Sequence, residues 1–263
     1  MRAVIREIRG FLGALFVALL IRTFLVQPFV IPSPSMYPTV EIGDFILVTK
    51  YSFGYTNYSL PFAPPLFKGR LLEMSKPERG QVLVFRNPVN ETTSLLKKVM
   101  FQDESLDFIK RLIGLPGDRI QVTGGILHIN GESVKLEKLG EYTYHDPRSK
   151  EEPLKYKSVT VVTQYRETLP NGVSHLILKD APFGQGDLDN TPEYIVPEGH
   201  YFFMGDNRDH SGDSRVPSQL GFVPEDNIIG PAKLIFFSTE AKWYHPLDWI
   251  TGIRPSRIFN IIR

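Results

Sequence analysis

An apolar run directly behind a basic N-terminus constrains this chain more than any other feature. The run FLGALFVALLIRTFLVQPFVI covers residues 11–31 and follows the segment MRAVIREIRG. Its central part, residues 11–21, is only as long as the hydrophobic region of a cleavable secretory signal, which leaves cleavage open as an alternative. The whole run approaches the roughly 20 residues that a spanning helix needs, if Arg22 snorkels to an interface and Pro28 marks the end. We therefore interpret residues 1–31 as a short tail followed by an uncleaved membrane anchor.

The charges around the anchor predict its orientation. Arg2, Arg6 and Arg9 precede the apolar run. By the positive-inside rule the N-terminus then lies in the cytoplasm, and the chain from Pro32 onward lies outside. The sequence thus predicts a single-pass protein whose folded domain is extracytoplasmic and close to membrane lipid.

Beyond the anchor the sequence predicts a mainly β protein. Runs of β-branched and aromatic residues closed by turn residues occur in EIGDFILVTKYSFGY, ERGQVLVFRNP, FIKRLIGLPGDRIQV, GGILHINGESVKL and HYFFMGDN. Asn130-Gly131 is a strong signal for a hairpin with a type I′ turn. Residues 136–197 are charged and turn-rich. We predict an antiparallel-sheet domain from residues 32–135 and 198–263, with residues 136–197 as an inserted β subdomain of lower importance to the chemistry.

Composition excludes several classes of function. With 30 basic and 29 acidic side chains the formal charge is +1, so the chain lacks the basic field that attracts nucleic acid. It has no cysteine, which removes thiol nucleophiles and thiolate metal sites. Its six histidines form no HExxH motif and no close ligand pair, and we expect neither a metal nor a cofactor. Any nucleophile must be an oxygen or an amine.

Two serines stand among prolines directly behind the anchor. Ser33 and Ser35 lie in IPSPSMYPT, and a serine is a weak nucleophile unless a base lies beside it. A lysine serves as that base if burial lowers its pKa from about 10.4 toward neutrality. In FIKRLIG a strand places Lys110 on the same face as Phe108 and Leu112, and Arg111 on the opposite face. An edge strand with two solvated cations is the alternative, and this run alone favours it.

A third polar cluster follows an aromatic run near the C-terminal end. The stretch MGDNRDHSGDSR covers residues 204–215. A solvated, hydrogen-bonded loop is the common outcome of such a composition. A calcium loop is disfavoured, because Arg208 occupies a position where a ligand is needed.

Taken together and in this order, the anchor, IPSPSMYPT, GDFILV, ERGQVLVFRNP, FIKRLIGLPGD and GDNRDHSGDSR resemble bacterial type I signal peptidases. These are serine proteases of the bacterial cytoplasmic membrane that remove signal peptides from exported preproteins. The resemblance covers roughly residues 11–123 and 200–232. It implies that Ser35 is the nucleophile and Lys110 the general base. Ser33 and the backbone N–H of Ser35 would form the oxyanion hole, and Ser211 would orient the Lys110 amine.

The resemblance also implies a substrate site and a set of supporting ion pairs. Signal peptides would bind extended, with small residues of an Ala-x-Ala site in shallow apolar pockets. The matching positions are Phe29, Ile31, Pro32, Met36, Val40, Phe108 and Ile109. Arg111, Asp206, Asp213 and Arg215 match positions that support the site through ion pairs. Pro34 and His210 depart from the family pattern, as does the longer segment VPSQLGFVP, and they affect the pocket more than the mechanism.

Two other readings explain part of the pattern. Self-cleaving repressors share a Ser-Lys dyad and part of a β fold, but they need a DNA-binding domain, and the basic anchor is no substitute. An anchored binding or assembly protein that has lost catalysis would keep the fold. The presence of every expected catalytic residue argues against it.

Overall fold

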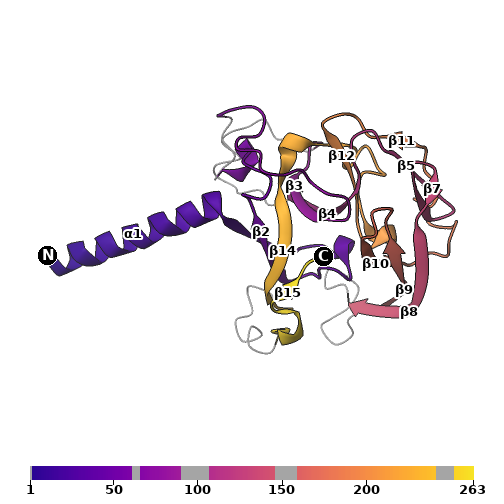
Figure 1. The fold of residues 1–263 in the computed structure, drawn as a ribbon. Helices are drawn as coiled ribbons and strands as arrows, with labels where there is room; N and C mark the ends of the chain where they lie inside the picture. Colours follow the sequence, from indigo (N-terminus) through magenta and orange to yellow (C-terminus); the bar gives the residue numbers. More distant parts are fainter. Residues whose placement is uncertain (1, 61–65, 90–106, 146–158, 241–251) are drawn as a thin grey trace.

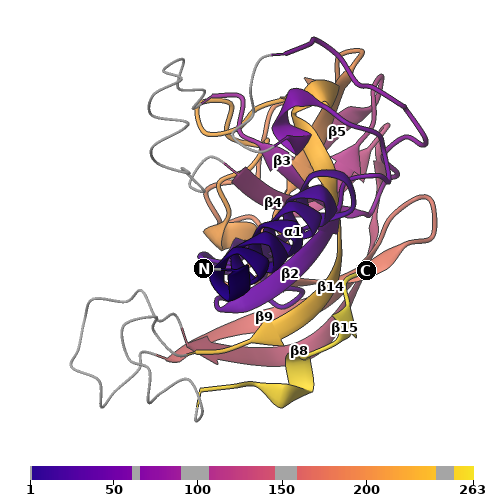
Figure 2. The same cartoon turned by 90° about the vertical axis from the view of Figure 1, so that its left-hand side faces the viewer.

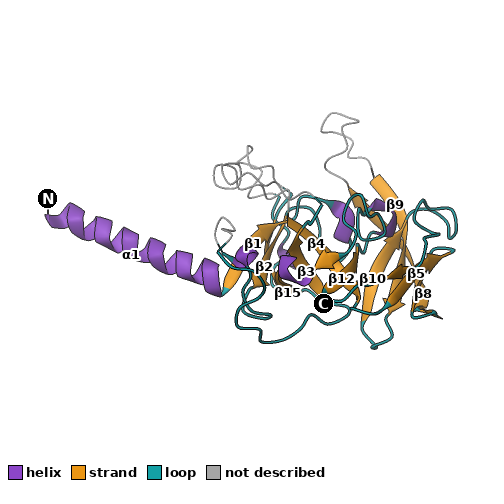
Figure 3. Ribbon diagram, turned by 90° about the horizontal axis from the view of Figure 1, so that it is seen from above, coloured by secondary structure: helices purple, strands orange, loops and turns teal. Residues whose placement is uncertain are grey.

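The computed structural model describes residues 2–60, 66–89, 107–145, 159–240 and 252–263. Its N-terminal helix α1, Arg2–Phe24, extends away from a body built mainly of strands (Figures 1 and 3). The segment is helical as the sequence predicts. Within the described residues, however, no helix combines the length and the apolar character needed to cross a membrane.

An antiparallel sheet of eight strands forms the centre of the body, in the order β1-β2-β14-β3-β4-β12-β13 with β15 paired to β14. Figure 2, in which α1 points toward the viewer, shows strands of this sheet behind the helix. The strands are β1 (Val26–Val30), β2 (Asp44–Thr49), β3 (Val82–Arg86), β4 (Asp107–Gly114), β12 (His200–Met204), β13 (Val223–Pro224), β14 (Ile228–Ser238) and β15 (Asn260–Ile261).

Two smaller antiparallel sheets complete the body. One has the order β11-β5-β6-β7 and consists of β5 (Arg119–Thr123), β6 (Ile126–Ile129), β7 (Glu132–Ser133) and β11 (Tyr194–Ile195). The other has the order β10-β9-β8 and consists of β8 (Lys135–His145), β9 (Val159–Thr168) and β10 (Ser174–Lys179). The mainly β, antiparallel fold class predicted from the sequence is therefore confirmed. The division into a main domain and an insertion remains a prediction.

The predicted hairpin at Asn130-Gly131 is confirmed. Residues of β6 and β7 pair on either side of it, with Ile129 opposite Glu132. Asn130 has φ +56° and Gly131 has φ +85°. A type I′ turn requires positive φ at both central positions, which asparagine and glycine adopt at the least steric cost.

The core lies on both faces of the central sheet, and this decides where β4 can place its side chains. Ile109 packs with Ile31, Met36 and Val40 in one apolar cluster. Leu112 packs in another, with aromatic residues of β3 and β12. From Ile109 to Gly114, β4 is covered on both faces, so its charged side chains there are buried and must find partners.

Candidate active site

The serine pair lies on a short, tightly held turn between β1 and β2. Pro34–Met36 form a 3-10 turn, η1, in which the Tyr37 amide donates to the Pro34 carbonyl at 3.0 Å. Pro34 stands at the start of the turn, where its fixed φ suits the geometry and its missing N–H costs nothing. Ser35 lies at the middle of the turn and is buried. The prolines thus order this hydroxyl through the local backbone.

Lys110 reaches that hydroxyl from β4. Its Nζ donates to Ser35 Oγ at 2.6 Å and to the Ile109 carbonyl at 3.0 Å. The residue is only 4% exposed, and Nζ lies 5.5 Å from the centre of the Phe108 ring. β4 pairs with β3 on one side and β12 on the other. The alternative of an edge strand with solvated cations is therefore wrong.

Burial changes the acid-base chemistry of this amine. Desolvation lowers the pKa of Lys110 from 10.5 to about 8, although Asp213 and Asp206 act to raise it. With that pKa about one amine in ten is neutral at pH 7, and removal of its proton costs about 1.4 kcal/mol instead of the ~5 kcal/mol of a free lysine. At neutral pH the Lys110 amine is therefore neutral in only a minority of the molecules.

Ser33 lies beside the Lys110–Ser35 pair. Its backbone is extended, with φ −133° and ψ 153°, and it precedes η1 directly. Its Oγ is 3.3 Å from Ser35 Oγ, and the residue is half-buried. The two serine hydroxyls of IPSPSMYPT therefore lie close together beside the Lys110 amine.

Two buried ion pairs lie around these groups. Arg111 donates to Asp206 through Nε at 2.8 Å and through Nη2 at 2.7 Å, and both side chains are almost completely excluded from solvent. Arg215 binds Asp213 in the same two-pronged way, at 2.8 Å through Nε and Nη2. Burial would raise the pKa of each carboxyl, but the paired arginine outweighs it and keeps the pKa low. Each carboxylate therefore stays charged and fixed in place.

Ser211 lies close to Ser35 and to the Asp213 carboxylate. Its Oγ is buried, and it meets hydrogen-bond geometry with no described group, although it lies close enough to the Asp213 carboxylate to help keep the pKa of that group low. A Cβ built on Gly205 would lie 2.2 Å from Ser211 Oγ and 2.5 Å from the Ser35 carbonyl oxygen. Only glycine fits at that position. The proposed role of Ser211 in orienting Lys110 remains a prediction.

A second group of charged side chains, which the sequence did not predict, lies near the ion pair of Arg111 and Asp206. Arg208 binds Glu167 of β9 through two nitrogens, at 2.9 and 2.5 Å. His175 of β10 places Nε2 3.2 Å from a Glu167 oxygen and 4.0 Å from Asp206. Burial, reinforced by Arg111, lowers the pKa of His175. Residues 136–197 thus contribute Glu167 and His175 to the buried charged groups near Asp206, and the lower importance of this segment to the chemistry remains a prediction. An inward position in the alternating strand SHLILK was the one available signal for His175.

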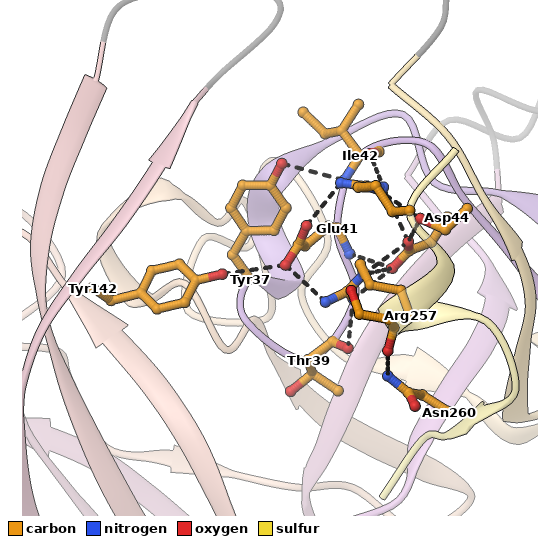
Figure 4. A network of polar contacts seen from close by, with 11 residues as sticks. Tyr37, Thr39, Glu41, Ile42, Asp44, Tyr142, Arg257 and Asn260 are labelled. Carbon is orange, nitrogen blue, oxygen red and sulfur yellow. Dashed lines mark hydrogen bonds and ion pairs between the residues drawn. The ribbon is translucent and has the colours of Figure 1, made fainter. Parts of the chain in front are cut away.

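A further polar network joins the segment at the start of β2 to the C-terminal segment and to β8. Figure 4 shows Glu41 and Asp44 facing Arg257 from the C-terminal segment. Arg257 Nη2 donates to Asp44 at 2.6 Å and Nη1 to Glu41 at 2.7 Å. Tyr142 of β8 reaches Glu41 at 3.3 Å. No group of three or more histidine and acidic side chains in the described segments is arranged to hold a metal ion.

Comparison with known proteins identifies the family. Residues 4–237 match the model of the family described as signal peptidase, peptidase S26. The chain belongs to this family of serine endopeptidases. The resemblance inferred from the ordered motifs is thereby confirmed, and the family supports signal peptide cleavage as the activity.

Relatives within the signal peptidase family match nearly the whole chain. The signal peptidase I of Rickettsia typhi (strain ATCC VR-144 / Wilmington) is 41% identical over 276 residues, which cover 98% of this chain and 94% of the relative. That of Rickettsia canadensis (strain McKiel) is 41% identical over 272 residues, with coverage of 97% and 92%. Among solved structures, a signal peptidase I from Enterococcus faecalis V583 matches 60% of this chain and 98% of its own, at 23% identity and a TM-score of 0.30.

The positions expected to line the substrate site of a signal peptidase differ in exposure. Ile31, Met36, Val40 and Ile109 lie in one buried cluster, against which Phe29 packs. Phe108 is half-buried, and Pro32 is exposed. The residues of the first group are thus packed in the core around the serine turn, to which Met36 itself belongs. Their contact with substrate remains a prediction.

Proposed function

We propose that this chain is an endopeptidase of the bacterial cytoplasmic membrane that removes signal peptides from exported preproteins with a Ser-Lys dyad. The observation that carries the proposal is the 2.6 Å contact between Lys110 Nζ and Ser35 Oγ inside a buried site. A lysine with a pKa of about 8 supplies a neutral amine at moderate cost. The hydroxyl that it activates lies on a turn whose backbone is already ordered.

The groups divide the reaction between them. Neutral Lys110 accepts the Ser35 proton while Oγ bonds to the scissile carbonyl carbon. The Ser33 hydroxyl and the Ser35 backbone N–H donate to the oxygen on which negative charge develops. The lysine then gives its proton to the leaving amine, which leaves an acyl ester on Ser35. Lys110, neutral again, takes a proton from a water molecule that attacks this ester. It returns the proton to Ser35 Oγ as the bond between Oγ and the acyl carbon breaks, and the free acid leaves.

The substrate proposed is an extended peptide with small residues before the cut, as in an Ala-x-Ala site. Bulky apolar side chains stand next to Ser35 and Lys110 in the chain, namely Met36 of η1 and Ile109 of β4, and both are fully or almost fully buried. Such packing leaves little depth for a substrate side chain, so we expect a methyl group to fit and larger side chains to be excluded. The partners are therefore signal peptides and membrane lipid, with no nucleic acid, and the reaction needs no cofactor.

A direct assay tests this function. Detergent-solubilised protein is incubated with a preprotein that carries an Ala-x-Ala site, and the new N-terminus is mapped. Cleavage after the second alanine supports the proposal. Absence of cleavage, or cleavage that ignores replacement of either alanine by a large residue, contradicts it.

The activity is expected to rise with pH through an apparent pKa near 8. Because the neutral form of Lys110 is the active one, and its pKa is lowered to about 8, kcat/KM should increase about tenfold per pH unit below this value and level off above it. The measurement is a pH profile on one peptide between pH 5.5 and 10. A profile that still climbs steeply near pH 10 would indicate a solvated lysine and contradict the assignment.

The helix α1 is proposed to attach the domain to the membrane, with its N-terminus inside. Large apolar side chains on it face solvent, among them Phe11 at 69% and Phe16 at 62% exposure. Exposed apolar surface of this kind is stabilised by lipid. The wild type should stay in the membrane fraction after alkaline carbonate extraction, and a double Phe11→Asp, Phe16→Asp variant should be released.

Ile195→Asp provides the control for this membrane test. Ile195 is 63% exposed on β11, so its replacement changes charge and exposed apolar area without touching α1. The control should remain in the membrane fraction. A wild type found in the soluble fraction, or a double variant retained as well as the control, would contradict attachment through α1.

A further inference from the structure

The turn that carries Ser35 is held against the body by one side chain in particular. Asn207 follows β12 and is completely buried. Its backbone N–H donates to the Ser35 carbonyl at 3.1 Å, and its Nδ2 donates to the Pro34 carbonyl at 3.2 Å. Two consecutive carbonyls of η1 thus depend on the position of one asparagine.

The orientation of that asparagine depends in turn on the sheet β10-β9-β8. The second proton on Asn207 Nδ2 is directed to the hydroxyl oxygen of Tyr144 at 3.3 Å. Tyr144 lies near the end of β8 and is 8% exposed. Its ring meets the ring of Tyr37, the residue directly after η1, edge to face at a centroid distance of 4.8 Å. Tyr144 therefore contacts the serine turn from two sides, through Asn207 and through Tyr37.

We propose that Tyr144 is a positioning residue for the nucleophile, acting through Asn207. The two amide protons of Asn207 have different acceptors, Pro34 O and Tyr144 Oη, and together these fix the rotation of the amide. Without the Tyr144 oxygen a buried donor loses its acceptor, and the amide turns or shifts to find another. The Ser35 turn then loses part of its support, and the 2.6 Å distance to Lys110 Nζ is less well maintained. Rate depends steeply on such distances. The inference rests on the proposed function.

Tyr144→Phe tests this role, and Tyr142→Phe is its matched control. Tyr142 lies two residues earlier on β8, with its ring 6.3 Å from that of Tyr144, and its hydroxyl makes one hydrogen bond of the same 3.3 Å length, to Glu41 (Figure 4). Each substitution removes a single oxygen. Tyr144→Phe should lower kcat about fivefold at unchanged KM, the effect of one lost hydrogen bond. Tyr142→Phe should leave kcat unchanged, while both lower the melting temperature by similar amounts.

A double-mutant cycle with Asn207→Ala separates positioning from general loosening of the sheet. If Tyr144 acts through Asn207, then Tyr144→Phe should lower kcat in the wild type and have no further effect in the Asn207→Ala background. If Asn207→Ala does not fold, the values of kcat for Tyr144→Phe and Tyr142→Phe are sufficient to test the inference. An unchanged kcat in Tyr144→Phe, or an equal loss in Tyr142→Phe, overturns the inference. A wild type without cleavage activity would instead refute the proposed function.

Discussion

A Lys110→Met variant is expected to cleave no substrate and to be more stable than the wild type at pH 7. The loss of activity follows from the removal of the only group within hydrogen-bond distance of Ser35 Oγ that can take its proton in the described structure. The gain in stability follows from the buried amine. Its pKa falls from 10.5 to about 8 on folding, which corresponds to about 3 kcal/mol of unfavourable desolvation for the charged form. Methionine has a similar length and carries no charge.

The lowered pKa of Lys110 also makes the stability difference between the wild type and Lys110→Met depend on pH. The folded-state pKa lies below the unfolded one, so between pH 8 and 10.5 the folded protein binds fewer protons than the unfolded chain. The wild type should therefore become more stable as pH rises through this window. Below pH 8 the desolvation cost of the charged Lys110 amine is fully present. In urea unfolding at pH 7, the free energy of unfolding of Lys110→Met should exceed that of the wild type by about 1–3 kcal/mol. This difference should become smaller by pH 10.

Lys179→Met is the matched control for this comparison. Lys179 is another buried lysine, but its Nζ lies 2.6 Å from Asp189 and 2.9 Å from Asp209. Replacing it leaves two carboxylates without their cation, which should cost about 3–5 kcal/mol. If Lys110→Met is destabilised in the same way, the account of its desolvation is wrong. If Lys110→Met retains turnover, the dyad is wrong.

The fold class and the central pair of the site were predictable because the information is local. Ser35 and Lys110 each lie in a short motif, and the order of those motifs along the chain carries the resemblance to the signal peptidase family. The burial of Lys110 was harder to predict. Period-two alternation assigns faces to a strand, but it does not distinguish an edge strand from a central one. That distinction depends on β3 and β12, which come from distant parts of the sequence.

Among the groups that were missed, His175 alone has a local signal, its inward position in the alternating strand SHLILK. Tyr144, Glu167 and His175 lie on β8, β9 and β10, in that order, and the register of these strands decides which side chains face inward. No turn residue or motif marks them, and the surrounding sequence is charged, which favours a solvated interpretation. The membrane anchor remains a prediction, because no helix among the described residues has the length and apolar character needed to cross a membrane.

The two serines of IPSPSMYPT are expected to differ sharply when each is replaced by alanine. Ser35→Ala removes the oxygen that forms the acyl ester and should reduce cleavage to background. Ser33→Ala removes one hydroxyl, whose Oγ lies 3.3 Å from Ser35 Oγ, and leaves the nucleophile in place. If that hydroxyl donates to the developing oxyanion, its loss should lower kcat by roughly 10² to 10³, or about 2.7–4 kcal/mol. KM should change little, because the contact strengthens only in the transition state.

Ser33→Thr distinguishes a donor from a spacer at this position. Threonine keeps the hydroxyl and suits the extended backbone that Ser33 adopts, with φ −133° and ψ 153°. It should recover a substantial part of the activity lost in Ser33→Ala. If its added methyl group blocks the substrate instead, KM should rise while kcat recovers. The measurement is kcat and KM for the three variants on one peptide. Unimpaired kcat in Ser33→Ala would remove this hydroxyl from the oxyanion hole, and turnover in Ser35→Ala would require another nucleophile. A Ser33→Ala variant with a raised KM and an unchanged kcat would assign the hydroxyl to ground-state binding, because a donor to the oxyanion acts only where the charge develops.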